Sequence, residues 1–465
     1  MNTSIPAQQW RDLVGRYDLS GPRYTSYPTA LQFRPEFALA DQLEAMLNSQ
    51  RHNKPLSLYF HLPFCQSLCY YCGCNKVVTR NRNRVDEYLQ SLAQEMEHYR
   101  ELVGIYREVR QLHWGGGTPT YLSHKQMAQL MALTLRYFNL ACDDSAEHAV
   151  EIHPGQTAVE TIEVLRGLGF NRLSMGVQDF NPQVQAAVNR FNSEAQVRDL
   201  VERARQCGFH SINMDLIYGL PHQSLASFTQ TLDSVIQLRP NRLSLFSYAH
   251  MPAQIKSQRL IHSVDLPAAE VKLQIFSHAL EQLQREGYVH IGMDHFALET
   301  DDLVLAQREN RLQRNFQGYA TGRECDLIGL GVSSISSVGN VYWQNQKSVK
   351  DYQQALNSGR LPVERGVCLT RDDVIRRWAI TQLMCHYRLD WQELGEHFGV
   401  IATDYFATEL EALAELERDG LLTLSDDGLE VSRLGKMVIR RIAMVFDAYL
   451  AKNPRHGAGR YSKVI

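Results

Sequence analysis

The 465-residue sequence has no apolar run long enough to cross a membrane or to act as a secretory signal. A membrane-spanning helix needs about 20 consecutive, predominantly apolar residues, and residues 1–15 contain no apolar run of signal-peptide length. Cysteine is also scarce, since nine cysteines in 465 residues are too few for a scaffold held by disulfides. These absences predict a cytoplasmic protein without a membrane span.

A large excess of charge of either sign is absent as well. The formal net charge is −3, which gives no electrostatic reason to expect nucleic acid or an anionic membrane as the main partner. Glycine (29) and proline (15) are near their average usage and 44% of the residues are hydrophobic, which excludes collagen-like and disordered chains. The length is sufficient for roughly two to four domains.

Short apolar segments of strand length alternate with segments of helical periodicity in the middle of the chain. The predicted strands span residues 56–60, 111–114, 149–152, 172–175, 211–216 and 242–247. The predicted helices span residues 85–101, 125–137, 158–168, 194–207, 225–238 and 268–286. Six successive strand–helix units predict an α/β fold with a parallel sheet and right-handed crossovers. We assign this barrel, with an extension, to residues 56–365.

The two ends of the chain differ from this α/β region. Residues 1–55 are largely irregular, with the run Ser20-Gly-Pro-Arg-Tyr-Thr-Ser-Tyr-Pro-Thr29, and predict an N-terminal arm or cap. Residues 366–465 predict a mostly helical, winged-helix-like domain. Its predicted elements are helices at 371–386, 390–398 and 404–419, a hairpin turning at 426–428, and a helix at 433–450. Because this domain carries 13 Lys and Arg against 15 Asp and Glu, we do not expect it to bind DNA.

Four of the nine cysteines fall within ten positions, in the segment Cys65-Gln-Ser-Leu-Cys69-Tyr-Tyr-Cys72-Gly-Cys74. Thiolates are the usual ligands of a 4Fe-4S cluster, so three closely spaced cysteines leave one iron free for another ligand. A zinc site normally has four ligands, typically in two separated pairs, and the spacing of Cys72 and Cys74 is wrong for a second pair. A structural metal knuckle or incidental free thiols are the simpler alternatives.

Glycine or polar residues also follow the other predicted strands. The glycine run 115–117 follows the second strand, where glycines let the backbone approach a ligand closely. Further residues of this kind lie in or just after strands three to six: Glu151, Gln178, Asp215 and Ala249. Since the carboxyl ends of parallel barrel strands form the active-site face, we expect these residues to converge. Taken singly, each could equally be an ordinary strand-end or helix-cap residue.

Together these motifs resemble the radical S-adenosylmethionine (SAM) superfamily and, within it, the oxygen-independent coproporphyrinogen III oxidase (coproporphyrinogen dehydrogenase) family. The resemblance extends over nearly the whole chain. It is carried by residues 21–28, 59–61, 65–76, 115–120, 171–180, 215–221, 248–250, 292–296 and 315–319. It implies a partial (β/α)6 radical SAM barrel with an N-terminal arm and a helical C-terminal domain. The chain departs from the family pattern at His153 and Gly155, where the family has Asp and Arg.

The resemblance also implies the cofactors and the residues that hold them. A 4Fe-4S cluster would be bound by Cys65, Cys69 and Cys72, and two SAM molecules are implied. The cluster-bound SAM would be contacted by Tyr59, Gly116, Glu151 and Ile335. The second SAM would be contacted by Tyr71, Gly117, Thr118, Gln178, Arg190, Asp215 and Ala249. Cys74 as a fourth ligand would close the iron that SAM must occupy, so we expect it to support the ligands or to face the substrate.

The implied reaction is the oxidative decarboxylation of two propionates of coproporphyrinogen III to vinyl groups, which gives protoporphyrinogen IX in haem biosynthesis. An unactivated propionate carbon is not attacked by side-chain acids or bases, so a cofactor must supply a radical and a reducing electron donor must supply an electron. Besides Cys74, Arg23 is a substrate-side candidate, because its planar guanidinium suits a carboxylate. A monomer is expected. A haem chaperone or a haem-degrading radical SAM enzyme is the alternative.

The cysteine assignment is tested by three single substitutions, Cys65→Ala, Cys69→Ala and Cys72→Ala. Each should abolish the cluster, because a cubane held by two thiolates is labile, whereas the reconstituted wild type should hold about four irons per chain. Cys74→Ala serves as the matched control and should keep its iron while turnover falls. Iron content and the brown chromophore are the measurements, and full iron in any of the three variants contradicts the assignment.

Overall fold

The computed structural model describes residues 15–17, 19–143, 145–321, 324–452 and 461. Residues 1–14 of the predicted arm therefore lie outside the described residues. The chain divides into two compact units that each combine distant segments. We call residues 33–279 and 323–368 the barrel unit, and residues 1–32, 280–322 and 369–465 the helical unit. No helix in these described ranges has both the length and the apolar character needed to cross a membrane.

The barrel unit contains six parallel strands at the positions that the sequence predicts, which confirms the α/β fold class. The strands are β1 (Leu56–Leu62), β4 (Glu108–Gly116), β6 (Glu147–Ile152), β7 (Arg172–Gln178), β8 (Ser211–Tyr218) and β9 (Arg242–Ser247). Their order in the sheet is β9-β8-β7-β6-β4-β1, so each strand lies beside its neighbour in the sequence of strand–helix units. This is the order that successive right-handed crossovers produce.

The sheet continues beyond β1 with strands that the sequence analysis did not predict. Strand β14 (Asp326–Leu330) pairs parallel to β1, with Tyr59 opposite Gly329. Antiparallel strands β15 (Ile335–Val338), β16 (Val341–Asn345) and β17 (Val363–Cys368) follow. Minor strands are β2 (Phe64–Cys65), β3 (Val77–Val78) and β5 (Asn139–Leu140). The barrel is therefore partial, because its sheet runs on into an antiparallel edge instead of closing.

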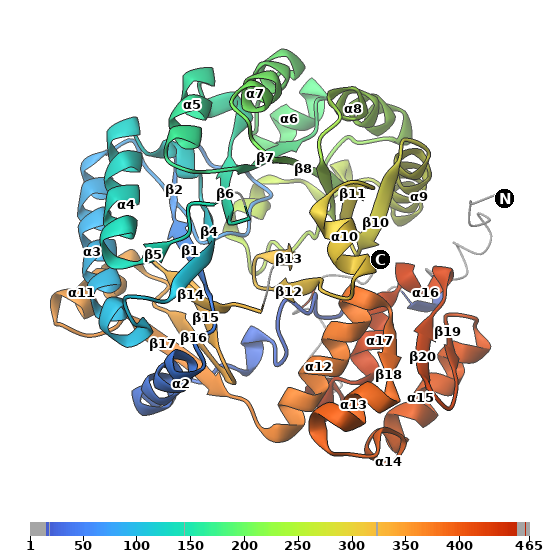
Figure 1. The fold of residues 1–465 in the computed structure, drawn as a ribbon. Coiled ribbons are helices and arrows are strands. Elements are labelled where there is room, and N and C mark those ends of the chain that lie inside the picture. The colour runs from blue at the N-terminus through green and yellow to red at the C-terminus, as the bar shows by residue number, and fades with distance from the viewer. Residues whose placement is uncertain (1–14, 18, 144, 322–323, 453–460, 462–465) are drawn as a thin grey trace. The chain divides into compact units, whose positions relative to one another are not determined.

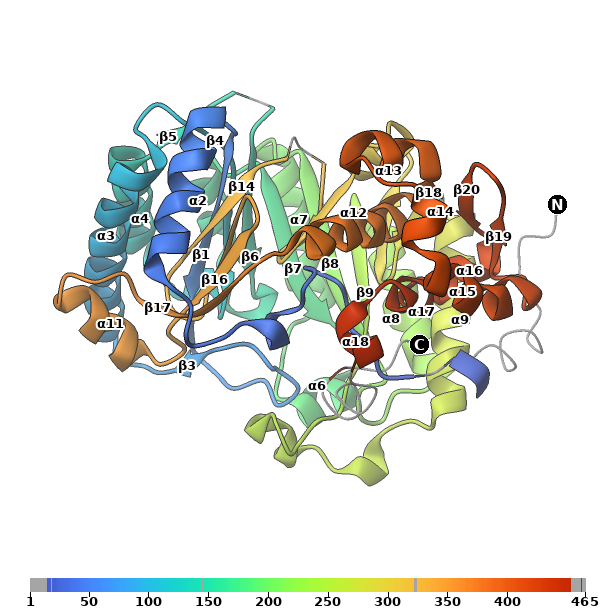
Figure 2. The same cartoon turned by 90° about the horizontal axis from the view of Figure 1, so that it is seen from below.

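Amphipathic helices connect the parallel strands. They are α3 (Asn83–Val103), α4 (His124–Tyr137), α5 (Val159–Gly167), α7 (Glu194–Gln206), α8 (Leu225–Leu238) and α9 (Ala269–Arg285), with α2 (Leu39–His52), α6 (Pro182–Val188) and α11 (Val349–Asn357) in addition. Figure 1 and Figure 2 show α3 and α4 side by side, outside the strands of the sheet. Helices α4, α7 and α8 each begin at a serine that forms a capping box, which explains where these helices start.

Alternating burial along the strands separates a helix-facing side from a more open side. In β6, Val150 and Ile152 are buried, whereas Ala149 and Glu151 are half-buried. A strand points successive side chains to opposite faces, so the half-buried series lies on the face away from the helices. This is the face on which polar strand residues can meet a ligand.

The C-terminal part of the helical unit follows the predicted helix, helix, helix, hairpin order. Its elements are α12 (Arg371–His386), β18 (Arg388–Asp390), α13 (Trp391–Phe398), α14 (Ala402–Tyr405), α15 (Ala407–Arg418), β19 (Leu422–Leu424), β20 (Gly428–Val431), α16 (Arg433–Met437), α17 (Ile439–Val445) and α18 (Ala448–Lys452). Strands β18, β20 and β19 form a small antiparallel sheet. The other elements of the unit are β10 (Tyr288–Gly292), β11 (His295–Leu298), α10 (Asp302–Arg308), β12 (Gln313–Asn315) and β13 (Gly318–Ala320).

Two helices predicted as continuous are interrupted in the structure. The predicted helix 404–419 breaks at Phe406, and the predicted helix 433–450 breaks at Val438 and again at Phe446. Phe406 and Phe446 are completely buried, and their rings pack edge to face with centroids 5.0 Å apart. Tertiary packing of these two rings thus overrides the helical periodicity of the local sequence.

Residues 19–32 of the predicted arm pack within the helical unit, whereas residues 33–55 belong to the barrel unit. Arg440 donates hydrogen bonds to the carbonyls of Gly21 and Pro22. Tyr24 donates to Asp447 Oδ2 at 2.9 Å, and Tyr27 accepts from the backbone N–H of Ala448 at 3.1 Å. Both tyrosines are buried, so they hold the arm in place and are not exposed to stack on a substrate ring.

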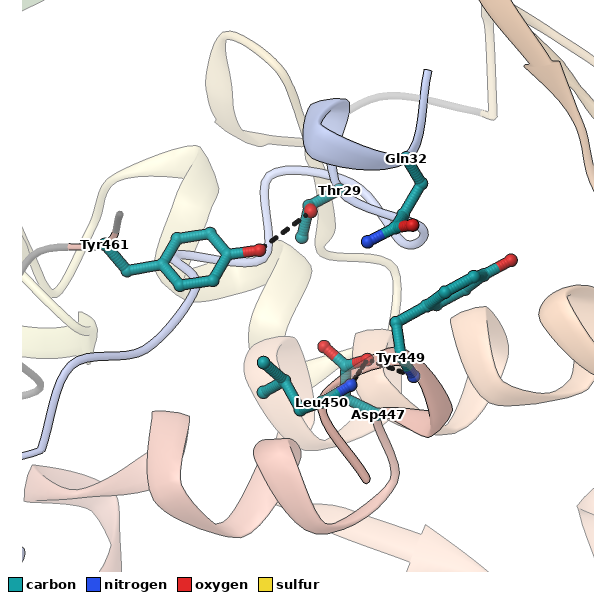
Figure 3. Close-up of a pocket in the computed structure, with 6 residues that line it drawn as sticks. All are labelled: Thr29, Gln32, Asp447, Tyr449, Leu450 and Tyr461. Atoms are coloured by element: carbon teal, nitrogen blue, oxygen red, sulfur yellow. Dashed lines mark hydrogen bonds between the residues drawn. The ribbon is translucent and has the colours of Figure 1, made fainter. Parts of the chain in front are cut away.

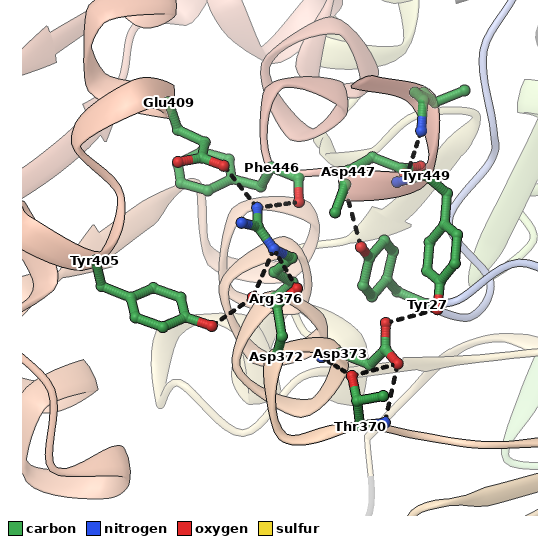
Figure 4. A network of polar contacts seen from close by, with 12 residues as sticks. Tyr27, Thr370, Asp372, Asp373, Arg376, Tyr405, Glu409, Phe446, Asp447 and Tyr449 are labelled. Atoms are coloured by element: carbon green, nitrogen blue, oxygen red, sulfur yellow. Dashed lines mark hydrogen bonds and ion pairs between the residues drawn. The ribbon is translucent and has the colours of Figure 1, made fainter. Parts of the chain in front are cut away.

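Polar residues of the helical unit are organised around Arg376 of α12. Its guanidinium pairs with Asp372 and Glu409 and donates to the carbonyl of Phe446 (Figure 4). A neighbouring small pocket is lined by Thr29, Gln32, Asp447, Tyr449, Leu450 and Tyr461 (Figure 3).

A buried carboxyl on α3 organises the turn between β14 and β15. Glu95 accepts hydrogen bonds from Gly331 N at 2.7 Å, Tyr352 OH at 2.6 Å and Asn345 Nδ2 at 2.6 Å. Two helical turns before Glu95, Tyr88 OH donates a hydrogen bond to the carbonyl of His61 at 2.7 Å and accepts one from Val332 N at 2.8 Å. Helix α3 thereby ties the end of β1 to the turn that leads into Ile335.

The burial of Glu95 predicts how the free energy of unfolding depends on pH. Burial raises its pKa from 4.5 to about 7, despite the hydrogen bonds from Tyr352, Gly331 and Asn345. Below about pH 4.5 the carboxyl is protonated in both states, and between pH 4.5 and 7 only the unfolded chain releases the proton, so stability should fall across that window. The loss is on the order of 3 kcal/mol. Thermal unfolding of the apoprotein from pH 5 to 8 should show this slope in the wild type and a flatter curve in Glu95→Gln; equal slopes contradict it.

Candidate cofactor site

Three of the predicted site residues in the barrel unit lie on the half-buried face of neighbouring strands. Tyr59 of β1 is in register with His113 of β4, and both are half-buried. Glu151 of β6 is in register with Ser174 of β7, and Gly176 of β7 with Asp215 of β8. Because register and alternation together fix the face, the structure brings Tyr59, Glu151 and Asp215 onto one side of the sheet, as the sequence predicts.

The glycine loop is hydrogen-bonded to the segment that leads into the cysteines. Gly117 N donates to the carbonyl of Leu62 at 2.8 Å, and Thr118 N donates to that of Phe64 at 2.9 Å. A Cβ atom on Gly117 would lie 2.7 Å from the carbonyl of Pro63, and one on Gly116, whose φ is +106°, would lie 2.7 Å from the His61 ring. These glycines are therefore required for close packing of two backbone loops, in addition to any approach of a ligand.

Each of the three predicted cluster ligands receives a hydrogen bond on sulfur. Thr118 Oγ1 lies 3.7 Å from Cys65 Sγ, and Arg190 Nη1 lies 3.6 Å from Cys69 Sγ. The hydrogen bond from Cys74 lowers the pKa of Cys72 to about 6, assisted by the positive charges of Lys76 and Arg190. Burial, by contrast, raises the pKa of the Cys65 thiol to about 11. Cys74 itself is exposed and acts here as a donor to Cys72.

This donor set fits a 4Fe-4S cluster. Cys65 and Cys69 are only 9% and 8% exposed, and all three thiols lie on one loop. Among the described residues no three His, Cys, Asp or Glu side chains converge closely enough for a single metal ion. A cubane does not require such convergence, because its thiolates bind separate irons, and hydrogen bonds to the sulfurs are a lever that tunes cluster potential.

Glu151 presents a charged carboxylate at this site. His113 Nε2 lies 2.9 Å from Glu151 Oε1, and Gly116 N donates to Oε2 at 3.2 Å. Burial raises the pKa of Glu151, but the hydrogen bonds from His113 and Gly116 outweigh it, so the net pKa is lowered. Since 41% of the side chain remains exposed, the carboxylate can also bind a cationic group such as the ammonium of SAM.

His61 and Tyr59 form a second polar pair beside the glycine loop. His61 Nε2 lies 2.8 Å from the carbonyl of Asn75, so this nitrogen carries the proton. Its Nδ1 is then free to accept from Tyr59 OH at 3.2 Å. Burial lowers the pKa of His61, which keeps the ring neutral. His61 thus joins Tyr59 to the segment that follows the cysteines.

Three of the residues predicted for a second SAM, Gln178, Arg190 and Asp215, lie on or beside β7 and β8. Gln178 has a φ of 70°, and its buried Oε1 accepts no hydrogen bond from the residues that the structure describes. Arg190 Nε donates to the carbonyl of Gly176 at 3.0 Å. Asp215 accepts from Asn213 Nδ2 at 2.8 Å, and burial raises its pKa to about 6. An orphaned amide oxygen beside a carboxyl and a guanidinium fits a ligand rich in donors and acceptors.

Sequence reasoning missed Gln258, a 2% exposed residue in a 3-10 turn (Lys256–Leu260). Its Nε2 donates to the carbonyls of Tyr71 at 3.0 Å and Ala249 at 3.1 Å. It therefore joins two predicted contact positions, one on the cysteine loop and one after β9. Nothing in the local sequence distinguishes this glutamine from a surface residue, because no periodic pattern surrounds it. His113 was missed too, although its spacing before the glycine loop on an alternating strand was a usable signal.

Arg23, the other substrate-side candidate, belongs to the helical unit. Its guanidinium forms an ion pair with Asp294, and its carbonyl accepts from Arg314 Nη2 at 3.3 Å. About a third of the Arg23 side chain (34%) is exposed. Within this unit Arg23 therefore already has a carboxylate partner, the side chain of Asp294.

Comparison with known proteins identifies the fold and the family. The Radical SAM superfamily profile matches residues 59–235, and the HemN C-terminal domain profile matches residues 369–438. The chain is a radical SAM protein. A protein of Pseudomonas aeruginosa named oxygen-independent coproporphyrinogen III oxidase is 47% identical over 454 residues, which cover 98% of each chain. A protein of the same name from Escherichia coli is 47% identical over 453 residues, which cover 97% of this chain and 98% of the relative.

A solved structure agrees with these sequence matches. Coproporphyrinogen III oxidase (HemN) from Escherichia coli, described as a radical SAM enzyme, superposes with a TM-score of 0.90 at 47% identity, covering 92% of this chain and 98% of that chain. The chain belongs to the oxygen-independent coproporphyrinogen III oxidase family. The family resemblance seen in the sequence is thereby confirmed.

Gln258→Leu should weaken SAM binding without loss of the cluster. The substitution removes both donors to Tyr71 and Ala249, and two neutral hydrogen bonds together correspond to roughly tenfold or more in affinity. We expect the KM for SAM to rise by about that factor while kcat and iron content change little. Lys256→Gln, an exposed position on the same turn, is the matched control. An unchanged KM in Gln258→Leu would show that this amide does not position the site.

Proposed function

We propose that this protein catalyses the oxidative decarboxylation of two propionates of coproporphyrinogen III to vinyl groups, giving protoporphyrinogen IX. The observation that carries the proposal is the cysteine loop bonded to the glycine loop beside a charged Glu151, in a chain aligned over nearly its full length with relatives of that name. Relatives of that name, which align with this chain over nearly its full length, favour this activity over a haem chaperone or a haem-degrading enzyme. We further propose a cytoplasmic monomer.

Residues of the barrel unit would hold a 4Fe-4S cluster and two SAM molecules. When bound, the reduced cluster and SAM supply the carbon radical that removes hydrogen from the substrate propionate. Cys65, Cys69 and Cys72 would hold the cluster, and Tyr59, Gly116, Glu151 and Ile335 the first SAM. Tyr71, Gly117, Thr118, Gln178, Arg190, Asp215 and Ala249 would hold the second.

The protein's own contribution is binding, orientation and exclusion of solvent. The carboxylate of Glu151 is charged because His113 and Gly116 donate to it, so it can fix an ammonium group. The amide of Gln178 offers an acceptor without a competing partner among the described residues. Such groups contribute through position, because a reacting atom held at the correct distance removes much of the entropic barrier.

An anaerobic assay with dithionite, SAM and coproporphyrinogen III tests the proposal. Vinyl products should form with the reconstituted wild type and be absent with Cys69→Ala, which lacks a cluster ligand. Product analysis by mass follows the loss of two carboxyl groups. Stable haem binding without SAM cleavage would instead support the chaperone, and a methylated or opened haem the haem-degrading enzyme.

Arg23 is proposed to bind one propionate of the substrate, in exchange for Asp294. Arg23→Ala should lower turnover of coproporphyrinogen by roughly tenfold or more, the loss expected for a charged hydrogen bond, whereas cluster content stays at the wild-type level. The matched variant Asp294→Asn frees the guanidinium from its ion pair and should lower the KM for the substrate or leave it unchanged. Wild-type turnover and KM in Arg23→Ala would exclude this role.

A further inference from the structure

A long stretch of the chain around the cysteine loop contains no acidic residue. Between Glu44 and Asp86, residues 45–85 include six Lys and Arg and no Asp or Glu, although the whole chain has 51 acidic residues against 48 basic ones. Four of the six basic residues follow the last cysteine of the loop: Lys76, Arg80, Arg82 and Arg84. We call these four residues the basic platform. A nearly neutral chain thus concentrates positive charge in one segment of its sequence, which ends at Asp86 and Glu87.

The basic platform is attached directly to a cluster ligand. Strand β2 pairs with β3, with Cys65 opposite Val78, and Thr79 N donates to the carbonyl of Cys65 at 3.1 Å. Arg80 is the next residue, and it is exposed. One residue, Thr79, and one hydrogen bond therefore separate the exposed Arg80 from the backbone of a predicted iron ligand.

The platform is held by specific contacts. Tyr121 OH donates to the carbonyl of Thr79 at 2.7 Å, and the guanidinium of Arg82 lies 4.2 Å from the centre of the Tyr121 ring. Lys76 Nζ donates to the carbonyl of Cys72 at 2.7 Å. Lys76 and Arg82 thus anchor the segment. The exposed side chains of Arg80, Arg82 and Arg84 carry charges that a partner can meet.

Further positive charge adjoins this segment. Asn75 Nδ2 donates to the carbonyl of Lys347 at 2.9 Å, and the side chains of Lys347 and Lys350 are exposed. The first acidic residue of α3, Asp86, accepts a hydrogen bond from Gln126 Nε2 at 2.7 Å. Two exposed lysines from a distant part of the chain therefore lie near the end of the cysteine loop where the basic platform begins.

We propose that the basic platform is the docking surface for the electron donor, and that this donor is a small acidic protein carrying one electron. The inference rests on the proposed cluster and supplies the partner class that the proposed function requires. The carrier is oxidised by one electron and the cluster is reduced by one, with no bond formed or broken. Electrostatic steering suits such a partner, because electron-transfer complexes are small and transient and complementary charge mainly raises the association rate.

The test is the rate of cluster reduction, measured anaerobically by stopped-flow bleaching of the cluster absorbance. The probe is reduced flavodoxin, an acidic protein with one flavin, at low salt. In Arg80→Glu with Arg84→Glu, the second-order rate constant should fall about tenfold or more, within the range that electrostatic steering provides. Its salt dependence should also become weaker, because exposed charges are screened over about 10 Å at 0.1 M salt.

Two controls separate docking from other effects. Arg100→Glu changes an exposed arginine on the last turn of α3 and should leave the rate constant within about twofold of the wild type. The milder pair Arg80→Gln with Arg84→Gln should give an intermediate loss and serves if the double glutamate variant fails to fold. Reduction by dithionite should be equal in all variants, because this small reductant needs no docking surface.

An unchanged flavodoxin rate in both double variants would overturn the proposal, and so would a loss that appears equally with dithionite. The measurement needs neither SAM nor coproporphyrinogen, so an absence of vinyl product leaves it interpretable. If the wild type holds no iron after reconstitution, the proposed function fails first, and the two failures are thereby distinguished.

Discussion

The backbone contact between the glycine loop and the start of the cysteine loop is the constraint on which the rest of the site depends. Gly117 and Thr118 donate to the carbonyls of Leu62 and Phe64, and no side chain fits at Gly117 against Pro63. Since Leu62 ends β1 and Gly116 ends β4, this contact joins the ends of two neighbouring strands. It places Thr118 against Cys65 and the N–H of Gly116 against Glu151 in one arrangement. The predicted ligands of the cluster and of SAM are therefore positioned by the same few backbone atoms.

The charged groups around this contact fall into two sets, one on the inner face of the sheet and one on the exposed side of the cysteine loop. The carboxylate of Glu151 lies on the inner face of the sheet, where a cationic ligand would meet it, and Arg190 lies against Cys69. The positive charges of Arg80 and Arg84 lie on the exposed side of the loop. Buried charges are costly unless paired, so Glu151 needs the hydrogen bond that His113 donates and Arg190 needs the carbonyl of Gly176 as its acceptor. The outer arginines need no such partner because water solvates them.

The parallel strands and most helices were predictable because each has a strong local pattern. Strand β6 alternates in burial along its whole length, and α7 places its buried residues at helical spacing. Strands β14 to β17 were not predicted, because they are short and gain their stability from pairing with β1 and with each other. The interruption at Phe406 was equally invisible, since it results from contact with Phe446, forty residues further along the chain. The compact units also combine distant segments, which a division in sequence order does not represent.

The sequence by itself determined the chemistry of the site, because cysteine spacing, the glycine run and strand-end polar residues are local features that survive without coordinates. It determined the fold class for the same reason, through periodicity within each segment. Only the tertiary structure decided how these groups are supported: that Gln258 joins Tyr71 to Ala249, that Glu95 holds the turn before Ile335, and that Arg23 is paired with Asp294. These contacts link residues far apart in the chain, and no local pattern encodes them because their free energy arises only when the folded backbone brings the partners within hydrogen-bond distance.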